Sequence, residues 1–274
     1  MKHKNIVFIG AGNMAGAIIS GLLSKGYPAS AIRATTRSAE SAKSAGQRLG
    51  IEVSTDNHTA IQWADVVVLA VKPQMLADVC HSIQPSLQQQ LIVSVAAGIG
   101  CDDINQWLGG NRAIVRSMPN TPSQVGVGAS GLYANTQVSD AQRDFAGQLA
   151  GATGLFIWVD DEALIHAVTA VSGSGPAYYF LFMEAMIEAG VQLGLPPESA
   201  RTLTLQTALG AATLAGAADV PVDELKRRVM SPGGTTERAI HSFEEGGLRQ
   251  QVSKAMSECA ARSKTLAREL AGKP

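Results

Sequence analysis

The chain has 274 residues, of which 46% are hydrophobic and only 5% aromatic, and its formal net charge at pH 7 is −1. This length is enough for two domains with aliphatic cores, and the near-neutral charge argues against a nucleic-acid or membrane-surface partner. No apolar segment is as long as a membrane span. Cys80, Cys101 and Cys259 are widely spaced with no CxxC pair, which favours reduced thiols in a cytoplasmic protein.

The stretch from Ile6 to Leu22 predicts a buried strand, a glycine-rich turn and a helix in succession. Gly10, Gly12 and Ala15 follow the strand in a G-x-G-x-x-A spacing. In this arrangement the first glycine permits a tight turn, the second lets the backbone approach a pyrophosphate, and the small third residue lets the helix pack on the sheet. The first N–H groups of the helix then face the phosphates. The pattern favours a dinucleotide site; the alternative is a glycine-rich turn without a ligand.

The end of the second expected strand, Ala31 to Thr35, bears on the choice of cofactor. In NAD-binding folds an acidic residue here often holds the ribose 2′-hydroxyl, but this chain continues Thr-Thr-Arg-Ser, and its first carboxylate downstream is Glu40. Hydroxyls and the Arg37 guanidinium suit a 2′-phosphate, so we expect NADPH to be favoured over NADH by about ten- to hundredfold. Alternatively, Arg37 is a solvated surface residue near a helix start.

Two further apolar runs are typical of central parallel strands buried on both faces. The first, Val66 to Val71, ends in Lys72-Pro73, and Pro73 fits the first turn of the next helix. The second, Leu91 to Ile99, ends in small residues where a bulky side chain would obstruct a ligand. Because ligands of such sheets bind beyond the carboxyl ends of the strands, Lys72 is either a cofactor contact or a lysine on the rim.

Capping and turn signals outline the rest of the first domain. We expect a helix from Ser38 to Leu49 and a second one that is capped by Asn57 and ends at Ala64. A third helix is capped by Asp102 and Asp103 and ends at Leu108, and a fourth begins at a Ser139/Gln142 capping box and ends at Ala152. Short strands are expected at Val53, Ala113–Arg116, Gly126–Ala134 and Leu155–Val159. The alternation of strands and helices predicts an α/β fold, with a Rossmann-type dinucleotide-binding domain over residues 1–160.

From Asp160 onward the sequence predicts helices alone, as an all-α domain over residues 161–274. Asp160, Asp161 and Glu162 are either a carboxylate cluster for acid–base work or helix caps. Glycines and a proline at residues 172–180 interrupt a helical pattern and predict a kink or a close backbone approach. Small residues from Gly210 to Gly216 indicate close helix packing within a bundle or across a dimer.

A second glycine loop, SPGGTT at residues 231–236, precedes a helix expected from Glu237 to Phe243. Backbone N–H groups in such a loop can hold a carboxylate, and threonine hydroxyls can bind a substrate nitrogen or oxygen. The alternative is an ordinary capped turn between helices. A final helix is expected from about Leu248 to Leu270.

Six stretches in chain order, GAGNMA, LAVKPQ, SVAAGI, RSMPNTP, AVSGSGPAYYF and SPGGTTERAI, closely resemble the pyrroline-5-carboxylate reductase family over almost the whole chain. The resemblance implies reduction of the C=N bond of Δ1-pyrroline-5-carboxylate to L-proline by hydride transfer from NAD(P)H, the last step of proline biosynthesis. It also implies a nucleotide-binding α/β domain, a helical dimerisation domain and a homodimer. In the family such dimers often assemble further into a decamer, a pentamer of dimers.

Matching the family's motifs residue by residue implies two groups of site residues. The cofactor contacts would be Ile9, Gly10, Ala11, Gly12, Asn13, Met14, Thr35, Arg37, Asn57, Ala70, Val71, Lys72, Pro73, Ala96, Ala97 and Gly98. The substrate carboxylate would meet the backbone of Gly233, Gly234 and Thr235, and Thr236 would be the catalytic residue that hydrogen-bonds the ring nitrogen. Glu162 matches a position near the substrate, whereas Arg228 stands where relatives vary and receives no role. No spacing of His, Cys or Asp predicts a metal site.

Two other functions are open on the sequence. Related β-hydroxyacid and imine reductases typically use a helix lysine that faces the nicotinamide, but no lysine lies between Asp160 and Val220. A non-catalytic NADPH-binding protein would need the first glycine loop but not SPGGTT.

Overall fold

The computed structural model of the chain describes residues 3–272, which form two compact units. The first unit contains the residues up to Ser174 together with those from Cys259 onward, and the second is Gly175–Glu258. The segment from residue 161 to Ser174 therefore belongs to the first unit. The division of the chain into functional domains at residue 160 stays a prediction. Among the described residues, no helix is both long and apolar enough to cross a membrane.

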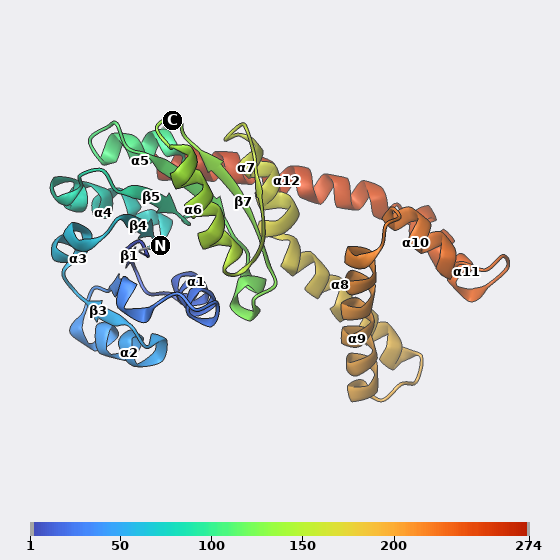
Figure 1. The fold of residues 1–274 in the computed structure, drawn as a ribbon. Coiled ribbons are helices and arrows are strands. Elements are labelled where there is room, and N and C mark those ends of the chain that lie inside the picture. Colours follow the sequence, from blue (N-terminus) through green and yellow to red (C-terminus); the bar gives the residue numbers. More distant parts are fainter. Residues whose placement is uncertain (1–2, 273–274) are drawn as a thin grey trace. The chain divides into compact units, whose positions relative to one another are not determined.

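The first unit is built on one eight-stranded sheet in the order β3-β2-β1-β4-β5-β6-β7-β8 (Figure 1). Only β6 and β7 pair antiparallel; the other neighbours are parallel. The strands are β1 Ile6–Ile9, β2 Ile32–Thr35, β3 Glu52–Ser54, β4 Val66–Leu69, β5 Leu91–Ser94, β6 Ile114–Met118, β7 Gly128–Ala134 and β8 Gly154–Trp158. The parallel part confirms the Rossmann-type prediction, and the order reverses between β1 and β4.

Helices cover both faces of this sheet, as strands that are apolar on every residue require. Alternate residues of β1 divide between two cores: Ile6 and Phe8 pack with α1 Asn13–Ser24, α2 Ala39–Leu49 and α6 Asp140–Gly151. Val7 and Ile9 pack with α3 Asn57–Trp63, α4 Leu76–Ile83 and α5 Cys101–Trp107. The period of two residues in a strand therefore assigns each side chain to one layer.

The caps of three helices differ in how well they were predicted. The Ser139/Gln142 capping box of α6 is confirmed. Asn57 as the cap of α3 is wrong: the cap is Asp56, whose Oδ1 accepts from His58 N at 2.9 Å and Thr59 N at 3.2 Å. Asp102 and Asp103 as caps of α5 are also wrong, because they lie inside its first turn and Gly100 is the N-cap residue.

A short helix, α7 Leu164–Val168, continues directly into a π-helical turn, Thr169–Gly173. This turn begins three residues before the interruption predicted at residues 172–180 and overlaps its start, and a π-bulge breaks the regular helical ladder. The segment lies on β7, where a Cβ added to Gly131 would stand 2.5 Å from a Val168 methyl carbon. Glycine at 131 therefore lets the backbone of β7 approach Val168.

The second unit is helical, as predicted. Its helices are α8 Gly175–Gln192, α9 Pro197–Ala217, α10 Val222–Val229, α11 Thr235–Glu245 and the first part of α12 Leu248–Leu270, which ends in the first unit. α11 begins two residues earlier than expected, so Thr235 and Thr236 form its first turn rather than the loop before it.

Candidate functional site

The carboxyl ends of five parallel strands bring the expected cofactor residues to one edge of the sheet. The glycine loop follows β1, and residues 35–37 are the last residue of β2 and the start of the loop after it. Asn57 follows β3, residues 70–73 follow β4, and residues 96–98 follow β5. Since these strands are parallel, their carboxyl ends share an edge, and the reversal of order between β1 and β4 marks the ligand crevice of such a sheet. Cofactor contact by the individual residues stays a prediction.

Gly10 and Gly12 have different physical tasks in the first loop. Gly10 has a φ of +103°, and a Cβ there would lie 2.6 Å from the Ala70 carbonyl oxygen, so only glycine fits between β1 and β4. Gly12 has an ordinary φ of −73° and open space where a Cβ would be. It is the N-cap of α1, and no side chain of residues 3–272 accepts a hydrogen bond there. The loop thus has the space and the helix-start amides that a pyrophosphate needs.

Arg48 is a supporting residue that the sequence did not reveal. It lies in the last turn of α2, and its Nη2 donates to the Ala11 carbonyl at 2.9 Å, across 37 residues of sequence. This hydrogen bond ties the middle of the glycine loop to the neighbouring helix. A basic residue in a last helical turn is common near the negative end of the helix dipole, so nothing local distinguished it.

The end of β2 and the loop after it carry a buried threonine and an exposed arginine. Thr35 is 1% exposed and its carbonyl accepts from Gly10 N at 3.0 Å, so it braces the glycine turn from behind. Ser38 caps α2 by accepting from Ser41 N at 3.2 Å. Arg37 is exposed and makes no hydrogen bond or ion pair with any residue that the structure describes. Its guanidinium is therefore available to an anion at this edge.

The loop after β5 is packed closely against the carboxyl-terminal helix. Gly98 has a φ of +79°, and a Cβ there would lie 3.2 Å from Leu270 Cδ1 and 3.7 Å from Leu266 Cγ of α12. Ala96 is buried, whereas Lys72 in the loop after β4 is exposed. The exposure of Lys72 leaves both of its expected roles, cofactor contact and rim lysine, open.

Glu162 and Asp161 divide the acidic cluster between two tasks. Asp161 Oδ1 accepts from Ala163 N at 2.8 Å in the turn before α7, whose N-cap residue is Ala163 and has no side-chain cap among the described residues. Glu162 Oε1 accepts from Cys101 N at 2.7 Å and lies 3.1 Å from Nη1 of Arg116, whose side chain is 4% exposed. Burial, and then the charge of Glu162, raises the pKa of the Cys101 thiol, so this cysteine is not a nucleophile at neutral pH.

The second glycine loop already binds a carboxylate of its own chain. Gly233 has a φ of +70°, and its N–H donates to Oε2 of Glu237 at 2.7 Å. Gly234 N donates to the Ser231 carbonyl at 2.9 Å, and Gly234 is the N-cap of α11 with no side-chain cap. Thr236 is half-buried in the first turn. The loop geometry therefore suits a carboxylate at Gly233, and Glu237 supplies one internally.

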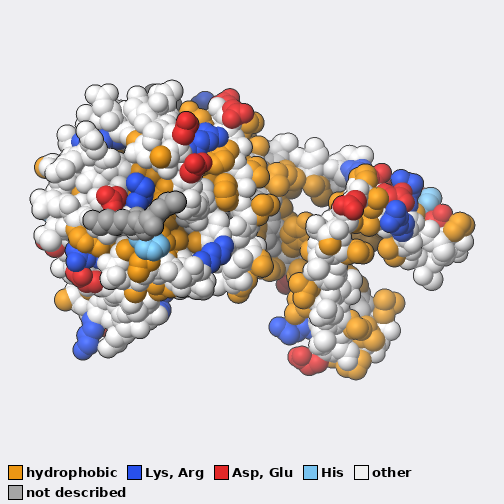
Figure 2. Space-filling view, in the orientation of Figure 1, with side chains coloured by type: hydrophobic (Ala, Val, Ile, Leu, Met, Phe, Trp, Pro, Cys, Tyr) orange, Lys and Arg blue, Asp and Glu red, His pale blue; other side chains and the backbone are white. Residues whose placement is uncertain are grey.

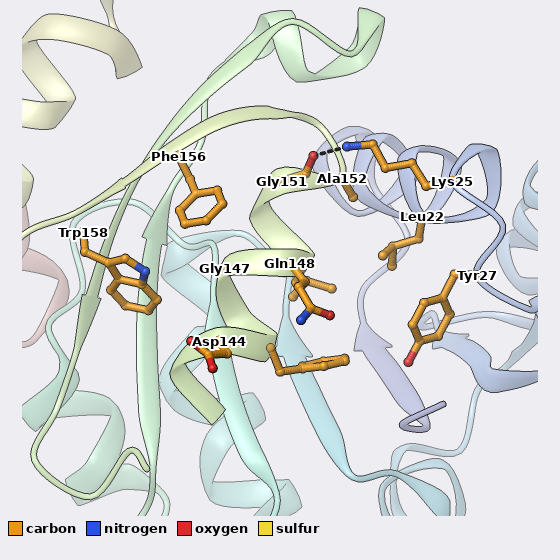
Figure 3. Close-up of a pocket in the computed structure, with 12 residues that line it drawn as sticks. Leu22, Lys25, Tyr27, Asp144, Gly147, Gln148, Gly151, Ala152, Phe156 and Trp158 are labelled. Atoms are coloured by element: carbon orange, nitrogen blue, oxygen red, sulfur yellow. Dashed lines mark hydrogen bonds between the residues drawn. The ribbon is translucent and has the colours of Figure 1, made fainter. Parts of the chain in front are cut away.

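A cavity of about 550 Å³ lies elsewhere in the first unit, between the end of α1, α6 and β8 (Figure 3). Tyr27, Phe156 and Trp158 line it, and Lys25 at its rim donates to the Gly151 carbonyl. α1 has 12 residues and is about 18 Å long, so the cavity and the glycine loop lie at opposite ends of this helix. The cavity is therefore separate from the expected dinucleotide site.

No three His, Cys, Asp or Glu side chains within residues 3–272 are grouped so that they could hold a metal ion.

Comparisons with known proteins agree with this geometry. Residues 162–266 match the family described as pyrroline-5-carboxylate reductase dimerisation, and residues 5–98 match NADP oxidoreductase, coenzyme F420-dependent. A pyrroline-5-carboxylate reductase of Pseudomonas aeruginosa is 54% identical over 98% of this chain and 99% of the relative. A solved structure of the reductase from Coxiella burnetii has a TM-score of 0.93 at 45% identity and covers 97% of this chain and 99% of its own. A solved structure of the pyrroline carboxylate reductase from Plasmodium falciparum, with NADP bound, has a TM-score of 0.86 at 28% identity. It covers 97% of this chain and 99% of its own.

Proposed function

The chain belongs to the pyrroline-5-carboxylate reductase family, and from this premise we propose how its residues divide the work. The reaction is the reduction of the C=N bond of Δ1-pyrroline-5-carboxylate to L-proline, with NAD(P)H as the hydride donor. It is the last step of proline biosynthesis. This family membership excludes the two alternatives, a β-hydroxyacid or related imine reductase and a non-catalytic NADPH-binding protein.

The reaction asks the protein for orientation more than for acid–base chemistry. A protonated imine is already electrophilic at its carbon, and bound NAD(P)H supplies the hydride. The protein must hold the reacting carbons roughly 3–3.5 Å apart and aligned. We assign the dinucleotide to the loops after β1, β2, β4 and β5, on the support of the open space at Gly12 and the uncapped start of α1.

We propose NADPH as the preferred cofactor. The support is chemical: Arg37 is exposed and without a partner among the described residues, and no carboxylate stands at the end of β2 to hold a ribose 2′-hydroxyl. A guanidinium and nearby hydroxyls favour the 2′-phosphate that distinguishes NADPH. Thr35 acts behind the loop, because its side chain is buried.

We assign the substrate carboxylate to the backbone amides of Gly233, Gly234 and Thr235, and the ring nitrogen to the Thr236 hydroxyl. The observation that carries this assignment is the Glu237 carboxylate 2.7 Å from Gly233 N, because it demonstrates an amide directed at a carboxylate. The substrate must displace Glu237 to use that amide. Thr236, half-buried beside the loop, can orient the imine nitrogen or pass it a proton through water.

We propose a homodimer as the working unit. The second unit carries large apolar side chains that remain exposed on α8 and α9, and Figure 2 shows such side chains over the surface of these helices. Examples are Phe180, Leu181, Leu203, Leu209 and Leu214. A second copy of the dimerisation domain would bury them. A pentamer of dimers is proposed on the family resemblance alone, and a reducing, cytoplasmic location on the three free cysteines.

The test compares Thr236→Ala with Thr236→Ser and with Thr136→Ala, an exposed threonine in a loop of the first unit. Oxidation of NADPH by pyrroline-5-carboxylate is followed spectrophotometrically, and NADPH binding by its fluorescence. Loss of a hydrogen bond to a charged nitrogen predicts a fall in turnover of about ten- to hundredfold for Thr236→Ala. Thr236→Ser and Thr136→Ala keep most of the activity, and all variants bind NADPH normally. Wild-type turnover by Thr236→Ala would remove Thr236 from the reaction.

A further inference from the structure

The carboxylate of Glu162 is engaged by the protein itself. Its Oε1 receives two hydrogen bonds, from Cys101 N at 2.7 Å and from Arg116 Nη1 at 3.1 Å. Arg116 comes from the middle of β6 and is almost fully buried, so Glu162 is the partner that balances its charge. Both hydrogen bonds end on Oε1, so Cys101 N and Arg116 fix the orientation of this carboxylate within the protein itself.

Cys101 is the first residue of α5, so its amide marks the end of the loop that follows β5. The start of the same loop is fixed to the sheet: Val95 N donates to the Leu69 carbonyl at 3.1 Å, and Ala96 N to Ser94 Oγ at 3.3 Å. The loop in between contains Ala96 to Gly98, which we assign to the cofactor. Glu162 therefore holds the far end of a cofactor loop whose near end is held by β4 and β5.

The outer side of this loop is held by α12. Leu266 and Leu270 lie against Gly98, and Ser263 of the same helix hydrogen-bonds to His166 Nδ1 of α7 at 2.9 Å. α7 begins two residues after Glu162. The segment around Glu162 and the end of α12 thus form one support around residues 95–101, assembled from parts of the chain more than sixty residues downstream.

We infer that Glu162 is a positioning residue for hydride transfer, which fixes the loop of residues 95–101 through Cys101 N and Arg116, and not a direct substrate ligand. The inference rests on the proposed function, which assigns the dinucleotide to this loop among others. A displacement of about 1 Å in reacting groups can lower a rate by about a hundredfold, so a loosened loop should slow the chemical step while leaving substrate binding nearly intact.

The experiment compares Glu162→Ala and Glu162→Gln with Glu52→Gln, which removes one partner of the exposed Arg33–Glu52 ion pair of 3.0 Å. For Glu162→Ala we expect kcat to fall at least tenfold, with the KM for pyrroline-5-carboxylate within about threefold of wild type. The deuterium isotope effect on kcat, with NADPH labelled at the transferred hydrogen, should rise as the chemical step becomes slower. Glu162→Gln should recover much of kcat, because its amide oxygen can still accept from Cys101 N, and Glu52→Gln should behave as wild type.

Hydrogen exchange of the amides of residues 96–101 gives a readout that does not depend on turnover. It should be faster in Glu162→Ala than in wild type and Glu52→Gln. If Glu162→Ala does not fold, Glu162→Gln carries the test, with a smaller fall in kcat at unchanged KM. A tenfold rise in KM at wild-type kcat would overturn the inference in favour of a substrate ligand. Unchanged kinetics and exchange in a folded variant would also overturn it. A wild-type enzyme inactive on pyrroline-5-carboxylate would instead refute the proposed function.

Discussion

Alanine substitutions at Gly10 and Gly12 should separate what the glycine loop does for the fold from what it does for the cofactor. At Gly10, a Cβ would stand 2.6 Å from the Ala70 carbonyl oxygen, on a residue with φ of +103°. Backbone strain of about 1–3 kcal/mol and overpacking of about 1–3 kcal/mol add to a loss of about 2–6 kcal/mol in the free energy of unfolding. Gly10→Ala should therefore lower the Tm by at least about 4 °C, or fail to fold.

Gly12→Ala should have the opposite effect, with little change in stability and weaker binding of NADPH. No atom of the described part of the chain lies within 4 Å of the added Cβ and φ is −73°, so the free energy of unfolding should change by less than about 1 kcal/mol. The methyl group instead occupies the space assigned to the pyrophosphate. A steric conflict of about 1–3 kcal/mol raises the Kd for NADPH about five- to hundredfold.

Thermal denaturation and fluorescence titration with NADPH measure the two effects on the same samples. Wild-type NADPH affinity in Gly12→Ala would show that the open space does not receive the dinucleotide. Wild-type stability in Gly10→Ala would show that a Cβ fits beside the Ala70 carbonyl after all.

Three further predictions concern other residues of the enzyme. Arg37→Asp should reverse the cofactor preference, with the Kd for NADPH rising at least about tenfold; fluorescence titration with NADPH and NADH measures it, and an unchanged NADPH affinity would remove Arg37 from the site. Glu237→Ala should lower the KM for pyrroline-5-carboxylate about fivefold, since the substrate no longer displaces a carboxylate worth about 1 kcal/mol from Gly233 N; Glu245→Ala on the same helix is the control, and an unchanged KM would contradict the displacement. Burial, and then the charges of Arg116 and Lys264, lowers the pKa of His166 below 6.5, so its neutral form stabilises the fold above that pH and this contribution is lost as the pH falls. The free energy of unfolding should therefore fall between pH 7 and 5 more steeply in wild type than in His166→Gln. Urea titrations at several pH values measure it, and the same fall with pH in both proteins would show that His166 does not contribute.

The sequence predicted those features that local physics determines. The glycine loop of residues 10–15, the Ser139 capping box and the last helix all lie where the pattern places them, because spacing and capping chemistry act within a few residues. The errors at Asn57 and Asp102 are also local: Asp56 offers a carboxylate one position earlier, and Gly100 starts α5 before the acidic pair.

The support of the site could not be predicted in the same way. Arg48 reaches Ala11 across 37 residues, and Glu162 reaches Cys101 across 61. Neither has a spacing that reveals its partner, because only the order of the strands and the packing of α7 bring them together. The antiparallel pairing of β6 with β7 likewise depends on tertiary packing and not on the composition of either strand.

The most direct measurement is a crystal structure of the enzyme with NADP⁺ and L-proline bound together. We predict the pyrophosphate at the start of α1, the proline carboxylate on the amides of Gly233 to Thr235 in place of Glu237, and the pyrrolidine ring against the nicotinamide. A structure in which the amides of Gly233 to Thr235 remain with Glu237 while proline binds elsewhere would contradict it.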